Sequence, residues 1–363
     1  MTTAKIPPPS LDALERPRKG RRRLSVLLVA LAVTVGIALF AVAWGSFSIP
    51  AGTIVRILWR RIWGIADGAS WPQAWEVVIL HVRLPRVLLA GLVGAALSQA
   101  GAVYQGLFKN PLADPYLIGV SSGAGLGATI AIACGLSFGW GTLGAVSVLA
   151  FVGALAATGS VYLLSRIGGR TSVVTLVLAG VALGAFFTSM QTFLMFQSQD
   201  AFHAVHIVSW LMGSFSLSSW AKVSLLAPVL AVGGSCLWAF GHRLNVMQLD
   251  EEEAQRLGIP VERTRLLLIV VASLVTATAV AVGGIIGFVG LIVPHAVRLG
   301  WGPDHRFLLP MSALCGAAFL VVADGIARTL LGPAEIPVGV VTAFFGAPFF
   351  LYLLRRRRLH VFG

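Results

Sequence analysis

Charge is scarce in this sequence. Only 11% of the 363 residues are Asp, Glu, Lys or Arg, whereas 57% are hydrophobic and the mean hydropathy is +0.87. A soluble domain is about 25% charged, and a core of this size cannot bury so much apolar surface. The composition therefore excludes an ordinary soluble protein and predicts an integral membrane protein. Its apolar runs are continuous and about 20 residues long, which favours helices over the shorter, alternating strands of a barrel.

Cysteine and catalytic motifs are scarce as well. The three cysteines, Cys134, Cys236 and Cys315, form no CxxC pair, which argues against a disulfide framework or a zinc site and favours a packing role. No phosphate-binding loop of the form GxxxxGK(S/T) occurs, so we do not expect this chain to hydrolyse ATP. The apolar segments also lack the clustered His, Asp or Glu of a membrane enzyme. We expect no enzymatic activity, no cofactor and no metal site.

Ten apolar segments are predicted to cross the membrane. The eighth is short and follows a glycine-rich stretch, so it is the segment most easily merged with its neighbour. No loop is long enough for a soluble domain. The predicted organisation is a basic tail (1–23), one membrane domain (24–354) and a second basic tail (355–363). The predicted segments are 24–46, 85–108, 116–136, 142–165, 172–197, 219–241, 264–284, 286–300, 307–331 and 337–354.

The basic residues predict the orientation. Ten spans place both termini on one side, and 20 of the 27 Lys and Arg residues fall on that side, including "RPRKGRRR" (16–23) and "RRRR" (355–358). An excess of basic residues marks the cytoplasmic side of a membrane protein. The net charge of +13 is therefore interpreted as anchoring to membrane lipid, and we expect no nucleic-acid partner. The remaining seven are predicted outside: Arg56, Arg60, Arg61, Arg83, Arg86, Lys222 and Arg328.

One hydrophilic segment interrupts the apolar sequence. "LDEEEAQRLGIPVERTR" (249–265) lies between the sixth and seventh predicted spans, hence in the cytoplasm. Asp250 can cap a short helix whose first turn of three glutamates suits the positive end of the helix dipole. Gly258 is a natural stop, and Pro260 prevents continuation.

Three ordered stretches of the sequence resemble a known family. They are "RLPRVLLAGLVGAALSQAGAVYQGLFKNPLADPYLIGVSSGAGLGA" (83–128), the hydrophilic segment, and residues 283–350, which begin "GGIIGFVGLIVPHAVRLG". Together they resemble the permease subunits of ABC importers for iron–siderophore complexes, haem and vitamin B12, over nearly all of residues 83–354. The resemblance implies an all-α type II permease of about ten helices in a prokaryotic inner (cytoplasmic) membrane.

The resemblance also implies partners. A second permease copy, expected to be an identical chain, would enclose a central path that opens to each side in turn. Two cytoplasmic ATPase subunits would dock below, and an extracytoplasmic substrate-binding protein would dock above. Short coupling helices at about 246–258 would meet the ATPase. The residues expected there are Asp250, Glu251, Glu252, Glu253, Ala254, Arg256, Leu257 and Gly258.

Further site residues are expected at the path and at its outer mouth. The start of the fifth span carries a cytoplasmic constriction in relatives, which corresponds here to Thr171, Ser172, Val173 and Val174. The vitamin B12 permease has small polar residues where this chain has the two valines, so a valine gate would close by excluding water. Gln191, Gln197 and Ser198 are candidates to line the path. Arg83, Arg86 and Arg328 are candidates to receive carboxylates of the binding protein.

Several alternatives remain open. The cargo is expected to be an iron chelate or haem, with vitamin B12 as the alternative. An ion-coupled secondary transporter would need acids within its spans, and only Asp324 comes close, where it can pair with Arg328 at i, i+4. His203 and His206 can share one face of a short outer helix, either as interfacial residues or against a haem or metal.

Overall fold

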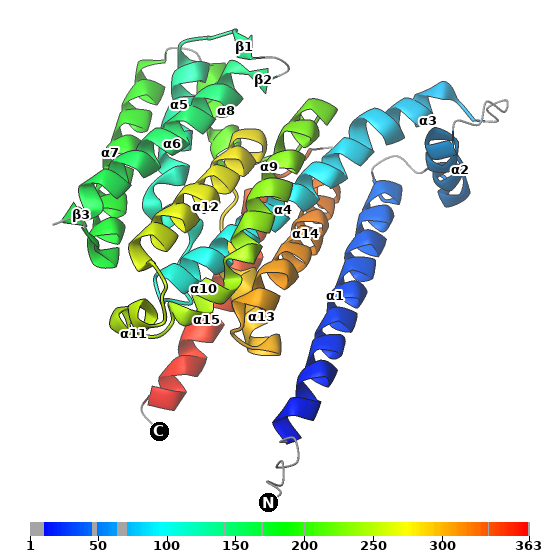
Figure 1. Cartoon of the computed structure of the whole chain (residues 1–363). Helices are drawn as coiled ribbons and strands as arrows, with labels where there is room; N and C mark the ends of the chain where they lie inside the picture. Colours follow the sequence, from blue (N-terminus) through cyan, green and yellow to red (C-terminus); the bar gives the residue numbers. More distant parts are fainter. Residues whose placement is uncertain are drawn as a thin grey trace, which may run out of the picture.

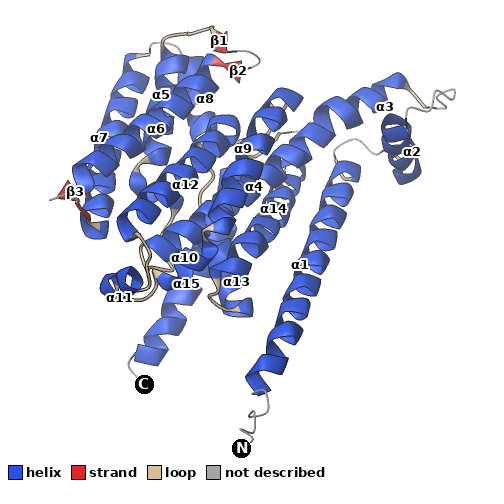
Figure 2. Ribbon diagram, viewed as in Figure 1, coloured by secondary structure: helices blue, strands red, loops and turns tan. Residues whose placement is uncertain are grey.

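The computed structural model describes residues 11–45, 49–63, 71–140, 143–167, 170–198, 201–332 and 334–361, and these fold into a helical bundle (Figure 1). Within these ranges the strands are confined to two short antiparallel pairs (Figure 2). The pairs are β1 (Gly139–Trp140) with β2 (Leu143–Gly144), and β3 (Arg166–Ile167) with β4 (Arg170–Thr171). The all-α fold class is thereby confirmed.

Each of the ten predicted segments coincides with a helix. Within the described residues, seven helical runs are long and apolar enough to cross a membrane. The segments at 116–136 and 337–354 correspond to shorter apolar helices, and the segment at 286–300 corresponds to the 13-residue helix α13. The helices are α1 (Leu11–Ala43), α2 (Ala51–Trp63), α3 (Gln73–Val77), η1 (Val78–Arg83), α4 (Leu84–Leu107), η2 (Pro115–Ile118), α5 (Val120–Ala133), α6 (Ala145–Ser165), α7 (Val173–Gln197), α8 (Ala201–Leu211), α9 (Trp220–Ala239), α10 (Gly241–Val246), α11 (Glu251–Arg256), α12 (Val261–Gly283), α13 (Val289–Trp301), α14 (His305–Thr329) and α15 (Val338–Val361).

Three boundaries differ from the predicted ones. The second span begins well before residue 85, because α3, the π-helical turn η1 and α4 form one continuous run over Gln73–Leu107. Both basic tails are also partly helical, since α1 begins at Leu11 and α15 continues to Val361. Apolar content sets the limits of a predicted span, but a helix continues wherever its backbone bonds are satisfied.

Helix α4 lies at the centre of the bundle, where it packs against α9, α12, α13 and α14 (Figure 1). Glycines make this possible. A Cβ on Gly101 would lie 1.9 Å from the carbonyl oxygen of Gly290 on α13, and one on Gly94 would lie 2.2 Å from that of Gly316 on α14. In lipid, such close backbone packing is a main source of helix association.

The second glycine stripe joins α5 to α6. A Cβ on Gly123 would lie 2.3 Å from the carbonyl oxygen of Gly153, and one on Gly127 would lie 2.0 Å from that of Leu149. Asp114 caps the 3-10 turn η2, which precedes α5, and its Oδ1 accepts from the backbone N–H of Tyr116 at 2.8 Å.

The chain is not helical between α12 and α13. Gly284 has φ +76° and Phe288 has φ +69°, both in the left-handed region. Tyr116 bridges the break, since its hydroxyl donates to the Ile286 carbonyl at 3.0 Å and accepts from the Ile286 N–H at 3.2 Å. The backbone N–H of Ser214 donates to the carbonyl of Gly283 at 3.0 Å. The predicted separation of the seventh and eighth spans is thus correct.

Candidate functional site

The hydrophilic segment folds into the predicted short helix, α11, which projects from one end of the bundle (Figure 1). Ala254 is its one buried residue and attaches the helix to the bundle. The remaining side chains of α11 are exposed, as is Leu257, at 63%. An exposed helix with three glutamates in its first turn, an arginine in its last turn and a protruding leucine after it offers a surface for another protein.

The C-terminal end of α11 agrees with the prediction, whereas its N-terminal end does not. Gly258 has φ +80° and stops the helix, with its N–H donating to the carbonyl of Gln255 at 2.9 Å. Asp250 occupies the N-cap position, but its side chain makes no capping hydrogen bond, so that part of the prediction was wrong. Its carbonyl accepts from the N–H of Ala254, and charge near the helix dipole remains its contribution at this end.

Arg265, near the start of α12, connects α11 to the rest of the molecule. Its guanidinium donates to the carboxylate of Glu251 on α11 and, at 2.5 Å, to that of Glu262. It also donates to the backbone carbonyl of Thr171 on β4 at 3.1 Å. The side chain of Arg265 is only 7% exposed, so these acceptors hold a nearly buried cation. The sequence interpretation assigned Arg265 no role at the site.

The Arg265 contact places the predicted coupling helix beside the predicted gate. The backbone N–H of Thr171 donates to the second oxygen of Glu262 at 3.3 Å. Both backbone polar groups of Thr171 are therefore bonded to side chains of α12, the N–H to Glu262 and the carbonyl to Arg265. Ser172 follows directly and caps α7, where its hydroxyl accepts from the N–H of Thr175 at 3.4 Å. Val173 is half-buried and Val174 is 68% exposed. A displacement of α11 is thereby connected through one side chain to the first turn of α7.

A cavity of about 240 Å³ lies at this junction. Phe108 and Lys109 at the end of α4 form one side of it, and Lys109 Nζ donates to the carbonyl of Leu249 at 2.6 Å. Val173, Glu251 and Arg265 are among the other residues that line it. The cavity thus lies between α11 and the adjoining ends of α4 and α7.

The candidate path residues lie along α7. This helix is mostly exposed in the single chain, with Leu176, Gly180 and Gln191 as its buried residues. Gln191 packs against α5 at Gly125, where an added Cβ would lie 3.0 Å from its amide. Gln197 is exposed, and Ser198 is half-buried. Gln191 and Ser198 therefore differ in surroundings although their spacing places them on one helical face.

The two outer histidines lie on α8, the short helix predicted there. His203 Nδ1 and the hydroxyl of Ser198 are 3.3 Å apart, and His206 is exposed. Within the described residues, no group of three or more His, Cys, Asp or Glu side chains is arranged to hold a metal ion.

The three arginines predicted at the outer mouth lie close together, and two of them contact the end of α1. Arg83 Nη1 donates to the carbonyls of Val42 and Ala43 at 3.1 and 3.2 Å, and Arg328 Nη2 donates to that of Ala41 at 2.6 Å. These carbonyls lie in the last turn of α1, where positive charge is favourable. All three arginine side chains are buried within the chain.

Asp324 pairs chiefly with Arg86, although the sequence suggested Arg328. Arg86 Nε and Nη2 donate to the buried carboxylate of Asp324 at 2.8–3.1 Å, whereas Arg328 Nε lies 3.9 Å from it. Arg86 Nη1 donates to the carboxylate of Glu335 at 2.9 and 3.0 Å, and the Glu335 side chain is 41% exposed. Asp324 therefore forms its main ion pair with Arg86, which is 238 positions away in the sequence, and not with Arg328, which is four positions away.

Comparison with known proteins gives consistent matches. Residues 28–356 match the family described as the FecCD transport family. The chain is 43% identical to the cobalamin import system permease protein BtuC of Halobacterium salinarum, covering 92% of this chain and 95% of that one. It is 40% identical to the hemin transport system permease protein HmuU of Yersinia pestis, covering 89% and 94%. A solved inward-facing metal-chelate type ABC transporter matches with TM-score 0.79 and 33% identity, covering 92% of this chain and 99% of that chain.

Proposed function

The chain belongs to the FecCD transport family, and from this premise we propose that it carries a metal chelate with a bulky organic ligand through the cell membrane of a prokaryote. It is a permease of a type II ABC importer, a class in which separate ATPase subunits hydrolyse ATP. We propose an iron–siderophore complex or haem as the cargo. Vitamin B12 is the second candidate, because the relatives named for cobalamin and for hemin are similar to this chain to nearly the same extent.

The cargo is tested with the cognate substrate-binding protein. Purified from cells, it should carry a chelate that absorption spectroscopy and mass spectrometry identify. Proteoliposomes containing the permease, its ATPase and that binding protein should then take up this compound only with internal ATP. Uptake driven by an ion gradient without ATP would instead support a secondary transporter.

The observation that carries the mechanism is the contact of Arg265 with both α11 and β4. We infer that the exposed face of α11, from Asp250 to Gly258, docks in the ATPase. Closure of the ATPase would displace α11, and the Arg265 contact would transmit this displacement to Thr171 and the first turn of α7. Rigid elements joined by a buried charged side chain transmit motion better than a flexible loop does.

Docking of α11 is tested by photo-crosslinking. A benzoylphenylalanine at Leu257, which is 63% exposed, should cross-link to the ATPase in a nucleotide-dependent way. Leu24 on α1 is similarly exposed, at 59%, and provides the control position. Equal cross-linking at both positions, or none at Leu257, would contradict the proposed contact. Protease or reporter mapping of the two termini tests their proposed cytoplasmic position.

We propose that a second identical copy covers α7 and that the path lies between the two copies. In support, the large side chains of α7 are exposed in the single chain, among them Leu178, Phe193 and Phe196. Six of the candidate path residues lie at the two ends of this helix: Thr171, Ser172, Val173 and Val174 at its start, and Gln197 and Ser198 at its end. Gln191, buried against α5, would reach the path only if α7 rotated. A Val174→Cys variant should form an intermolecular disulfide in the resting transporter, and failure under oxidising conditions would place α7 elsewhere.

We propose that Arg83, Arg86 and Arg328 dock the binding protein. Their convergence on one end of the bundle supports the proposal, and Glu335 already supplies one exposed carboxylate to Arg86. An incoming carboxylate would therefore compete with Glu335. Glu335→Gln should strengthen the binding of the binding protein, and Arg86→Glu should abolish it. Unchanged affinity in both variants would place docking on other residues.

A further inference from the structure

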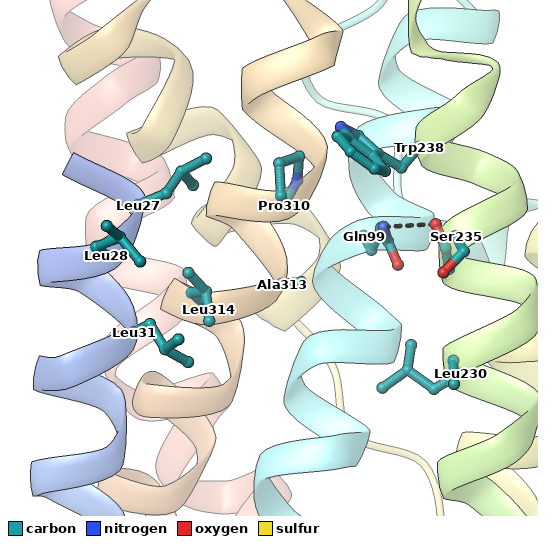
Figure 3. A pocket seen from close by; sticks show the side chains of 12 residues that line it. Leu27, Leu28, Leu31, Gln99, Leu230, Ser235, Trp238, Pro310, Ala313 and Leu314 are labelled. Atoms are coloured by element: carbon teal, nitrogen blue, oxygen red, sulfur yellow. Dashed lines mark hydrogen bonds between the residues drawn. The ribbon is translucent and has the colours of Figure 1, made fainter. Parts of the chain in front are cut away.

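An open apolar cleft separates α1 from α9 (Figure 3). Its volume is about 400 Å³, and α14 and α4 form its floor. Leu27 and Leu31 line it from α1, Leu230 from α9 and Leu314 from α14. Gln99 is the polar side chain at the floor, and its amide is occupied, because Nε2 donates to the carbonyl of Gly234 at 3.1 Å.

A second hollow continues the cleft toward the N-terminal end of α1. Its volume is about 760 Å³, and Leu27 and Trp238 line both spaces. Here the lining is basic, since Arg23, His242 and Arg306 contribute to it. The two spaces together form one groove with an apolar body and a positively charged end.

Pro310 allows α9 and α14 to be joined by a hydrogen bond at the junction of the two spaces. A proline has no N–H, so the carbonyl four residues earlier, that of Arg306, receives no helical hydrogen bond. Trp238 of α9 fills that vacancy, because its indole Nε1 donates to the Arg306 carbonyl at 2.9 Å. This bond holds the ring at the level where apolar and basic linings meet, as tryptophans do at a membrane–water boundary.

The charges at the basic end are not all neutralised. Arg23 pairs with Asp304, whose carboxylate also accepts from Asn245 at 2.7 Å. Although burial acts in the opposite direction, these hydrogen bonds lower the pKa of Asp304 below its usual value. The side chain of Arg306 is exposed and has no carboxylate partner within the described part of the chain. The groove therefore presents a net positive charge above an apolar cleft.

We propose that this groove binds one anionic phospholipid of the surrounding bilayer, with its phosphate at Arg306 and Arg23 and an acyl chain between α1 and α9. Complementary charge favours an anionic headgroup, and the adjoining apolar cleft favours a lipid over a free anion. The bound chain would fill the space beside α1 and hold this helix to the bundle. The assignment of this lipid to the cytoplasmic leaflet rests on the orientation proposed above. The proposal that the groove binds an anionic lipid is independent of that orientation.

The test uses the purified full-length permease alone, so its outcome is independent of cargo and ATPase. Native mass spectrometry would follow titration with phosphatidylglycerol or phosphatidylcholine. We expect preferential retention of phosphatidylglycerol, and about fivefold weaker binding in Arg306→Gln, since a basic residue near an anionic lipid contributes about 1 kcal/mol. Ala231→Phe places a ring in the cleft from an exposed position of α9 and should reduce binding of both lipids.

Arg355→Gln is the matched control, because Arg355 is an exposed arginine of α15 and lines neither space of the groove. The C-terminal end of α15 and the N-terminal end of α1 point to the same end of the bundle (Figure 1). It should leave lipid binding unchanged. Thermal unfolding would confirm that each variant is folded. Equal retention of the two lipids, an equal loss in Arg355→Gln and Arg306→Gln, or displacement of the lipid by inorganic phosphate alone would overturn the proposal.

Discussion

Replacement of Arg265 by Gln should uncouple ATP hydrolysis from transport. The substitution removes the guanidinium that contacts Glu251, Glu262 and the carbonyl of Thr171. A hydrogen bond from a buried charged donor contributes about 1.5–3 kcal/mol. Glu251 and Glu262 are 53% and 36% exposed, so each ion pair adds at most about 1 kcal/mol.

A loss of about 2 kcal/mol from the link corresponds to about a 30-fold change in a two-state equilibrium. We therefore expect the number of cargo molecules transported per ATP to fall at least about tenfold, while the ATPase continues to turn over. Arg265→Lys should give an intermediate value, because an ammonium keeps the charge but lacks the planar fork that serves three acceptors at once.

The assay is the ratio of uptake to ATP hydrolysis in proteoliposomes that contain the complete transporter. Arg263→Gln is the control, since Arg263 is an exposed arginine two residues away on the same helix. A double-mutant cycle with Glu251→Gln would measure how much the contact between Arg265 and Glu251 contributes to coupling. An unchanged ratio in folded Arg265→Gln protein would refute the idea that this side chain transmits the motion of α11.

Three further predictions concern stability and are measured by thermal unfolding in detergent. Gly258→Ala should cost about 1–2 kcal/mol, because the left-handed backbone disfavours a Cβ, and Gly258→Asn should cost less. Asp324→Ala should lower the free energy of unfolding by about 3–5 kcal/mol, because it leaves the buried Arg86 without its bidentate partner. Glu335→Gln, at the exposed end of the same cluster, should lower it by less than about 1 kcal/mol. Equal effects of the two substitutions would contradict the assigned pairing. Gly101→Ala should prevent correct packing of α4 on α13, while Gly159→Ala, which meets open space, should be neutral or stabilising by up to about 1 kcal/mol; a tolerated Gly101→Ala would mean that these helices are farther apart.

The sequence predicts the spans well because hydropathy is a local property. The ten apolar segments and α11 are each defined by consecutive residues, and the stop at Gly258 requires only local backbone geometry. The helix α2 was not predicted, because its run of alternating Trp, Arg and aliphatic residues over Ala51–Trp63 is too polar for a span. A search for amphipathic segments would have found it.

The contacts within the candidate sites depend on packing, which spacing along the chain does not reveal. Arg265 was grouped with other cytoplasmic basic residues, and only the approach of β4 to α12 shows its three acceptors. Likewise, Asp324 has an arginine four residues away, yet the better-oriented partner is Arg86 on another helix. A signal was present in both cases, since an arginine beside an apolar run requires acceptors.

The break between α12 and α13 has a consequence for biosynthesis. Helix α13 has 13 residues and is therefore about 20 Å long, shorter than the roughly 30 Å apolar layer of a bilayer. The ribosome-bound insertion machinery partitions segments into lipid by their apolar length, so α13 alone is a poor substrate for it. We therefore expect α13 to enter the bilayer late, after Tyr116 is already in place to receive the unwound peptide groups, which would make assembly of this region depend on chain synthesised some 170 residues earlier.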